Sequence, residues 1–425
     1  MHAKGLESTY PHTTYRIQFH KDFNFIHLEN ILPYLQQLGI TMIYASPILT
    51  STPGSRHGYD GTDMNQLNPE LGTLADLRRI RKKLDQYGIK WLQDIVPNHM
   101  AFHTANTWLM DILEFGKASS YNSYFDTCYH GHMFAPGKLM VPVLTKELRQ
   151  AIAEDELAVE QHGAKLYLRY GAGCYPLSPE SYCSIFADHL KTVHHDFNGF
   201  LVQVTTAQVN GNQEEWAELR GTIFSHIPNP VLDQCLEAIN NSPESLQELA
   251  DAQFYELCPW WDTQQRINYR RFFTINGLIC LNVHEPNVFE QTHQLVRQLV
   301  REGIIDGVRI DHIDGLYNPT QYLKDLRAWL GSACYIVVEK ILERDEALPQ
   351  VWPVQGTTGY EFLSACNNLL TCTEGKKKLS SYYKQLLAEQ KPLKMQQLEK
   401  KKAILSEYMQ GDVANLVNLL ADLLN

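Results

Sequence analysis

The stretch that decides the fold is Gly307-Val-Arg-Ile-Asp-His-Ile-Asp-Gly315. It begins as a short apolar strand and ends in carboxylates, a histidine and a glycine. In an extended chain Val308 and Ile310 face one side, while Arg309 and Asp311 share the other. The pattern predicts a strand with charge at its carboxyl end, where Arg309 would keep Asp311 ionised and correctly aimed. A purely structural ion pair is the alternative interpretation. The residues at the ends of neighbouring strands are needed to distinguish it from a functional site.

Strand and helix patterns alternate on both sides of this stretch, which is typical of parallel crossovers. The predicted strands are 15–19, 40–45, 89–96, 306–311 and 333–339, and the predicted helices are 25–38, 74–87, 288–301 and 320–330. Between 103 and 282 the alternation is lost, although helices are predicted at 214–220 and 231–251. The segment 46–64 is rich in Pro, Gly and Ser and is predicted to be a loop.

Polar side chains follow these strands at their carboxyl ends, where a (β/α)₈ barrel keeps its active site. They are Tyr59 and Asp60 after the second strand, Asp94, Asn98 and His99 at the third, Asp311 at the fourth and Glu339 at the fifth. We therefore expect an α/β fold, a (β/α)₈ TIM barrel with a large insertion after the third strand. Only five or six strand patterns are present, so we expect this barrel to be incomplete at the C-terminus.

The predicted domain organisation follows from this order of elements. We expect residues 1–102 to form the first part of the barrel with strands one to three, 103–282 an inserted lid or helical subdomain, 283–345 the continued barrel with strands four and five, and 346–425 a truncated helical segment. Lys-rich runs in the last segment are predicted to be solvated helix faces.

Composition and net charge limit the classes of partner that the protein is expected to bind. The chain has 425 residues and a net charge of -11, which argues against nucleic acid and against an anionic membrane surface, so a neutral substrate fits best. No apolar run of about 18 residues is present, and the nine cysteines are scattered without a Cys-x-x-Cys pair. Both features favour a soluble, cytoplasmic protein with reduced thiols. We expect no cofactor. His130, His132, His194 and His195 could be metal ligands, but no third ligand is evident, and solvated histidines and no metal site are expected.

Asp311 and Glu339 would be neighbours at the ends of adjacent strands, and two carboxyl groups about 5 Å apart are what a retaining glycosidase needs. Asp311 is the better nucleophile. Glu339 follows an apolar strand, so desolvation could keep it protonated as the general acid. Tyr59 could stack beneath a sugar, Asp94 could fix Arg309, and His99 could donate a hydrogen bond to a hydroxyl; each residue taken alone could equally be a cap or a core contact.

With these motifs in hand, the chain resembles the α-amylase superfamily of retaining glycosidases and transglycosidases. The matching regions are Asp94-Ile-Val-Pro-Asn-His99, Gly307-Val-Arg-Ile-Asp311 and Val338-Glu339. The resemblance implies that Asp311 is the nucleophile and Glu339 the general acid and base. The superfamily's third catalytic carboxylate lies on a later barrel strand, and no counterpart of it precedes Asn425.

More narrowly, the chain is similar to the superfamily members that turn the reducing-end α-1,4 bond of a maltooligosaccharide into an α,α-1,1 bond. The stretches that carry this likeness are 14–18, 46–48, 53–60, 97–100, 267–273, 311–316 and 356–360. The resemblance implies a closed pocket that retains the released glucose, with walls drawn from His57, His312, Asp314, Tyr269 and Arg270, and a functional link to a trehalose-releasing hydrolase. An α-glucan hydrolase and a catalytically silent glucan-binding remnant are the alternatives.

Overall fold

The computed structural model describes residues 10–128, 136–387 and 391–424. These residues form two compact units, which are considered separately. Unit 1 comprises Met1–Asn98 and Val283–Tyr408, and unit 2 comprises His99–Asn282 and Met409–Asn425, in each case as far as the residues are described. The candidate carboxylates Asp311 and Glu339 both belong to unit 1.

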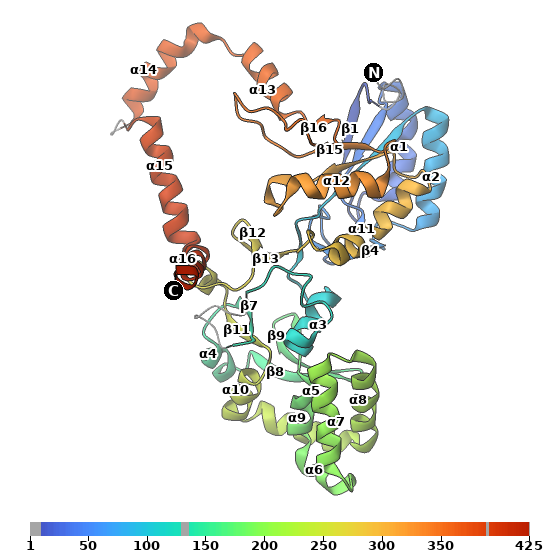
Figure 1. The fold of residues 1–425 in the computed structure, drawn as a ribbon, viewed down its shortest axis with the longest axis vertical. Coiled ribbons are helices and arrows are strands. Elements are labelled where there is room, and N and C mark those ends of the chain that lie inside the picture. Colours follow the sequence, from blue (N-terminus) through green and yellow to red (C-terminus); the bar gives the residue numbers. More distant parts are fainter. Residues whose placement is uncertain (1–9, 129–135, 388–390, 425) are drawn as a thin grey trace. The chain divides into compact units, whose positions relative to one another are not determined.

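Within the described part of unit 1, six parallel strands form one sheet with the order β1-β2-β5-β14-β15-β16 (Figure 1). They are β1 (Thr14–Ile17), β2 (Met42–Ala45), β5 (Lys90–Ile95), β14 (Gly307–Ile310), β15 (Tyr335–Val338) and β16 (Gly356–Thr357). Spatial order follows chain order, and β1 and β16 are the edges. The sheet is therefore part of a (β/α)₈ barrel, as predicted.

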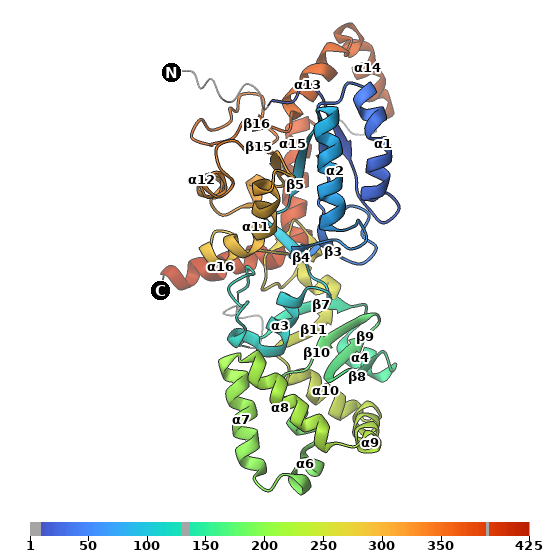
Figure 2. The same ribbon diagram turned by 90° about the vertical axis from the view of Figure 1, so that its right-hand side faces the viewer.

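Four helices cover one face of this sheet, and Figure 2 shows the first two of them side by side. They are α1 (Phe25–Gln37), α2 (Leu74–Tyr87), α11 (Pro286–Arg301) and α12 (Pro319–Leu330). Their apolar side chains pack with Val308, Ile310 and Val338 in one buried core. The alternation predicted for β14 is thus confirmed, because Val308 and Ile310 point to the helices and leave Arg309 on the opposite face.

The ends of these helices follow from local sequence. Thr73 accepts a hydrogen bond from the Asp76 backbone while the Asp76 carboxylate reaches back to the Thr73 backbone, so α2 begins with a capping box. It ends at Gly88, whose φ of 66° is the left-handed conformation that glycine adopts without strain. Proline in the first turn of α11 and α12 pre-sets the backbone for a helix.

The segment 46–64 is more ordered than predicted. It contains most of an antiparallel hairpin of β3 (Leu49–Ser51) and β4 (Gly61–Leu67) with shifts in register. The sequence prediction of a loop was wrong here because the strands are short and irregular, so they show no clean alternation of apolar and polar residues.

The rest of unit 1 is helical and largely exposed. It comprises α13 (Tyr360–Leu369), α14 (Lys376–Leu386), α15 (Leu393–Ala403) and a π-helical turn at Ile404–Tyr408. None of the described residues in these four segments is buried. The lysine runs 376–378 and 400–402 lie on exposed helix surface, as predicted.

Unit 2 combines small sheets with helices. Its described strands are β6 (His99–Ala101), β7 (Leu139–Leu144), β8 (Leu157–His162), β9 (Lys165–Tyr170), β10 (Gly173–Pro176), β11 (Tyr255–Pro259), β12 (Arg271–Phe272) and β13 (Ile275–Cys280). Its described helices are α3 (Thr107–Phe115), α4 (Leu148–Ala153), α5 (Pro179–Ile185), α6 (Ala187–Val193), α7 (Phe197–Asn210), α8 (Gln213–His226), α9 (Asn229–Asn240), α10 (Pro243–Asp251) and α16 (Gln410–Leu424).

Two details of unit 2 differ from the sequence prediction. The helix expected at 231–251 is two helices, α9 and α10, because Ser242 caps the second one and Pro243 starts it. The C-terminal helix α16 does not extend the exposed helices before it but packs within unit 2, where Asn415 donates a hydrogen bond of 2.6 Å to the Ile267 carbonyl. Gly411 sits so close to the Arg266 backbone that a Cβ atom would lie 2.9 Å from its nitrogen.

Candidate active site

The sheet register gathers the candidate side chains of unit 1 on the face opposite the helices. Asp94 is paired with Arg309, and Arg309 is paired with Val337. Paired residues of parallel strands point to the same side of a sheet, as do residues two positions apart on one strand. Asp311 and Glu339 lie two residues beyond Arg309 and Val337, so both carboxylates extend the same face at the strand ends.

Asp94 lies at the centre of the hydrogen-bond network on this face, and its side chain is fully buried. Its carboxylate accepts hydrogen bonds from Arg16 Nη1 at 3.1 Å, Tyr44 Oη at 3.0 Å, Tyr59 Oη at 2.5 Å and Arg309 Nη1 at 2.8 Å. The prediction that Asp94 fixes Arg309 is confirmed. A buried carboxylate with two arginine partners and two hydroxyl donors has its charge compensated and holds those donors in place.

Arg309 joins the three carboxylates of the site. Its Nη1 atom donates to Asp94 and, at 2.5 Å, to Asp311 Oδ1, while its Nη2 atom lies 3.1 Å from Glu339 Oε1. The arginine side chain is only 6% exposed. One guanidinium therefore holds Asp311 and Glu339 on neighbouring nitrogen atoms, in the planar fork geometry that arginine supplies and lysine does not.

The electrostatics of Asp311 differ from the sequence expectation. Burial raises the pKa of Asp311 to about 7, and the charges of Asp94 and Glu339 act in the same direction. Arg309 lowers this pKa but does not cancel the effect of burial. Arg309 thus pairs with Asp311 and favours its ionised form, as expected, but desolvation outweighs the ion pair, so the carboxyl group titrates near neutrality.

Glu339 is held from two sides. Its Oε2 atom accepts a hydrogen bond of 2.9 Å from the His312 backbone nitrogen, and its Oε1 atom lies beside Arg309 and 3.5 Å from the Tyr360 hydroxyl. The adjacent Lys340 binds Asp314 at 3.2 Å and Glu346 at 2.8 Å instead. Lys340 thus engages other carboxylates, and Asp314 serves it as a partner at a largely exposed position.

The turn after Asp311 has a strained residue and a glycine that accommodates it. His312 has φ 51° and ψ 48°, a left-handed conformation that costs free energy for a residue other than glycine. Its ring lies over Gly315, where an added Cβ would come 2.1 Å from the His312 ring and 2.9 Å from the Asn98 side-chain oxygen. Asn98 itself is buried. Gly315 therefore makes room for His312 and Asn98 next to the two carboxylates.

Tyr59 and Asp60 have different surroundings although they are adjacent. The Tyr59 hydroxyl lies between Arg16 Nη2, at 2.8 Å, and Asp94, and burial raises its pKa so that it stays a protonated donor. Asp60 turns into its own loop, where it accepts hydrogen bonds from Thr52 and Ser55. Tyr59 thus joins the candidate site, whereas the contacts of Asp60 shape the hairpin.

Three other predicted residues, His99, Tyr269 and Arg270, lie in unit 2. His99 is buried, is paired with Cys280 and packs against the ring of Phe272 at 4.6 Å. The Tyr269 hydroxyl donates to the Asn276 carbonyl at 3.0 Å, and Arg270 binds Asp126 at 2.6 Å. Roles of His99, Tyr269 and Arg270 toward a substrate stay proposals.

The sequence also offered two histidine pairs as possible metal ligands. His130 and His132 lie outside the described residues. His194 stacks on Phe200 with ring centroids 4.4 Å apart.

Sequence reasoning missed two members of this network. Arg16 and Tyr44 are paired on neighbouring strands, and the Arg16 guanidinium lies 4.3 Å from the centre of the Tyr44 ring. Arg16 is the second residue of the first predicted strand, and a charged residue within a strand is the signal that could have identified it. The register with Tyr44 could not be read from the sequence.

Comparison with known proteins agrees with this fold. Residues 27–173 match the alpha amylase catalytic domain. The parallel half-barrel and the residues at its strand ends thus place the chain in the α-amylase superfamily. Within it, the chain is a homologue of the maltooligosyl trehalose synthases: it is 32% identical over 376 residues to a putative maltooligosyl trehalose synthase of Mycobacterium tuberculosis, which covers 87% of this chain and 40% of that relative.

Solved structures give the same result. A glycosyltrehalose synthase of strain DSM5389 matches with a TM-score of 0.78 and 32% identity, over 96% of this chain and 48% of that chain. The maltooligosyltrehalose synthase of Arthrobacter ramosus matches with a TM-score of 0.75 and 28% identity, over 95% and 44%. The chain therefore spans less than half the length of these relatives. Among the described residues, no helix has both the length and the apolar character to cross a membrane.

Proposed function

We propose that the protein acts on maltooligosaccharides and converts their reducing-end α-1,4 bond into an α,α-1,1 bond by a retaining double displacement. The observation that carries this proposal is the pair Asp311 and Glu339, held on one guanidinium at adjacent strand ends. Retaining mechanisms need two carboxyl groups on opposite sides of one bond, one to attack and one to move a proton.

In the first displacement, Asp311 attacks the anomeric carbon of the penultimate glucosyl unit. Glu339 gives its proton to the glycosidic oxygen, so the bond to the terminal glucose breaks and a glycosyl ester forms on Asp311. Arg309 holds Asp311 in line for the attack. Since the pKa of Asp311 is about 7, the carboxyl group is ionised and nucleophilic mainly above that pH.

In the second displacement, the released glucose turns in its pocket and its anomeric hydroxyl replaces water as the nucleophile. Glu339 takes the proton of that hydroxyl, the ester bond to Asp311 breaks, and the α,α-1,1 bond forms. A pocket that retains glucose is what separates this outcome from hydrolysis. We propose His57 and His312 of unit 1 as part of its walls.

Incubation with maltopentaose tests the proposal. An intramolecular rearrangement removes reducing ends without shortening the chain, so the reducing-end assay should fall while mass spectrometry still shows five glucose units. Asp311→Asn and Glu339→Gln should abolish the change, whereas Asp345→Asn, an exposed carboxylate, should not. A rise in reducing ends would establish a hydrolase instead. If calorimetry shows that maltopentaose binds but no product forms, the chain is a glucan-binding protein without this activity.

Two wider proposals accompany this one. The product is a chain with a trehalose terminus, so a trehalose-releasing hydrolase is the class of enzyme that would consume it. We also propose a cytoplasmic location, since all nine cysteines lie among the described residues and are free thiols.

A further inference from the structure

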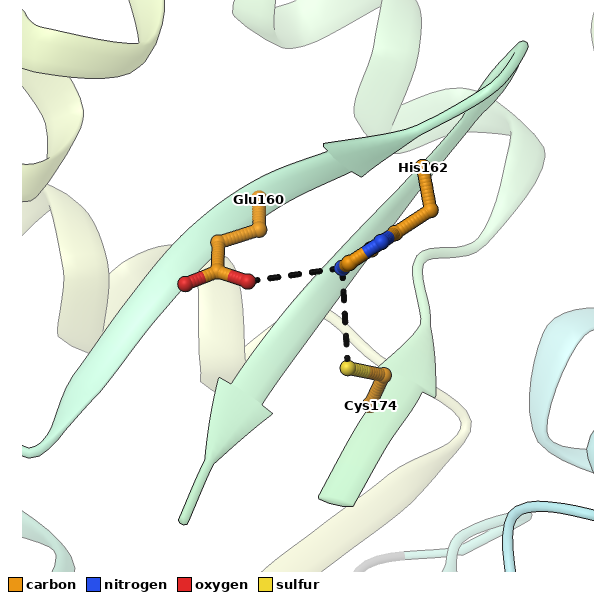
Figure 3. Close-up of side chains that lie close together, drawn as sticks. All are labelled: Glu160, His162 and Cys174. Carbon is orange, nitrogen blue, oxygen red and sulfur yellow. Dashed lines mark hydrogen bonds and ion pairs between the residues drawn. The ribbon is translucent and has the colours of Figure 1, made fainter. Parts of the chain in front are cut away.

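Three potential metal ligands meet on one sheet of unit 2. Within the described residues, β8, β9 and β10 form an antiparallel sheet with the order β10-β9-β8. Glu160 and His162 come from β8 and Cys174 comes from β10. Figure 3 shows the three side chains converging over the strand that lies between them.

The register explains why they converge. Cys174 is paired with Arg169, and Arg169 is paired with Ala158, so these residues share one face. Glu160 and His162 follow Ala158 at steps of two and face the same way. The opposite face carries buried apolar residues of the three strands, namely Leu157, Val159, Leu166, Leu168 and Tyr175. The sheet thus separates a core face from a polar face that carries all three side chains.

The distances match those between ligands on one zinc ion. His162 Nε2 lies 3.3 Å from Glu160 Oε2 and 3.7 Å from Cys174 Sγ, and the three ligand atoms lie within 4.8 Å of one another. Tetrahedral zinc with ordinary bond lengths separates nitrogen from oxygen by about 3.4 Å and nitrogen from sulfur by about 3.6 Å. A small movement of the side chains would bring all three to bonding distance of one ion.

Neighbouring residues orient these ligands. Arg169 Nε binds the other oxygen of Glu160 at 2.6 Å, which leaves Oε2 directed at His162. The rings of His162 and Tyr167 meet edge to face, with centroids 5.5 Å apart. Such supporting contacts fix the geometry of metal ligands, although the charge of Arg169 lowers the affinity for a cation.

His162 and Cys174 also line a cavity of about 500 Å³. A metal ion held by the three side chains would therefore face open space on one side. A thiolate, an imidazole and a carboxylate form a donor set that suits zinc and disfavours magnesium and calcium, which prefer oxygen ligands only.

We propose that Glu160, His162 and Cys174 form a zinc site with a fourth coordination position open to this cavity. Binding replaces the Cys174 thiol proton, which passes to the solvent, while His162 binds as the neutral ring and Glu160 as the carboxylate. This site goes beyond the sequence expectation of no metal, and it does not depend on the proposed activity of unit 1.

Equilibrium dialysis of the full chain against Zn²⁺, in the presence of a phosphine reductant, tests the site. We expect saturable binding of one ion per chain. His162→Gln and Cys174→Ser should each weaken it at least tenfold, whereas Cys372→Ser, at an exposed thiol of unit 1, should leave it unchanged. With Co²⁺, a thiolate-to-metal charge-transfer band should appear and should vanish in Cys174→Ser.

A second measurement needs no variant and therefore no assumption about folding. Zn²⁺ should slow the alkylation of Cys174 in the unmodified protein, as mapped by mass spectrometry, without slowing that of exposed Cys372. The proposal is overturned if the protein binds no zinc saturably, if Cys174→Ser binds it as well as the parent chain, or if Cys174 is not protected.

Discussion

The raised pKa of Asp311 implies that this carboxylate costs the protein stability at neutral pH. In the folded state the group binds a proton below about pH 7, and in the unfolded chain only below 3.8. Between these values the folded state holds more protons, so the free energy of unfolding falls as pH rises from 3.8 to 7. The whole difference corresponds to at most about 4 kcal/mol.

Asp311→Asn removes this dependence because an amide does not ionise. Relative to the parent chain, the variant should gain about 4 kcal/mol at pH 8 but only about 1 kcal/mol at pH 4.5, where most of the penalty is absent. Urea unfolding at the two pH values measures both differences. Any constant effect of the amide on packing or on Arg309 cancels when the two are compared. Asp345→Asn, at an exposed position, serves as the control.

A gain that is the same at both pH values would refute the reasoning, as would a gain that grows toward acid. Either result would mean that the attraction of Arg309 at least offsets the cost of burial. Asp311 would then be ionised throughout the neutral range, and the acid limit of the activity would have to come from another group.

Three further predictions concern Asp94, His293 and Gly315. Asp94→Asn should destabilise the protein by about 3–5 kcal/mol in urea unfolding, because two arginines lose their buried counter-charge; a loss below 1 kcal/mol would contradict this. His293 is buried, and its pKa is lowered to about 4, so the unfolded chain takes up a proton on this ring at a higher pH than the folded one. The free energy of unfolding should therefore fall by up to about 3 kcal/mol as pH drops from 6.5 to 4. His293→Gln should remove this dependence. Gly315→Ala should displace the His312 ring and lower kcat on maltopentaose at least tenfold with little change in thermal unfolding, whereas Gly375→Ala, which meets only a distant leucine methyl, should leave both unchanged.

The chemistry of the strand ends could be read from the sequence because it depends on local alternation. Val308 and Ile310 had to face the helices, so Arg309 and Asp311 had to face the other way, and neighbouring strands had to bring Asp94 and Glu339 to the same edge. Helix α2 was predicted with its observed bounds, since its cap, its apolar spacing and its terminal glycine all agree.

What could not be predicted depends on contacts between distant segments. The partnership of Arg16 with Asp94 requires the register of three strands. The protonation of Asp311 depends on how far burial outweighs an adjacent arginine, and no sequence pattern measures burial. The meeting of Cys174 with His162 follows only from the pairing of three short strands within a segment of mixed composition.

The docking of α16 on unit 2 has a consequence for synthesis. Unit 2 takes its residues from two parts of the chain, His99–Asn282 and Met409–Asn425, with the second half of the barrel sheet between them. The first part therefore leaves the ribosome long before the helix that packs against its Arg266 backbone. Domains usually fold in the order of their synthesis. Here a nascent chain exposes the surface that α16 covers until that helix has been synthesised.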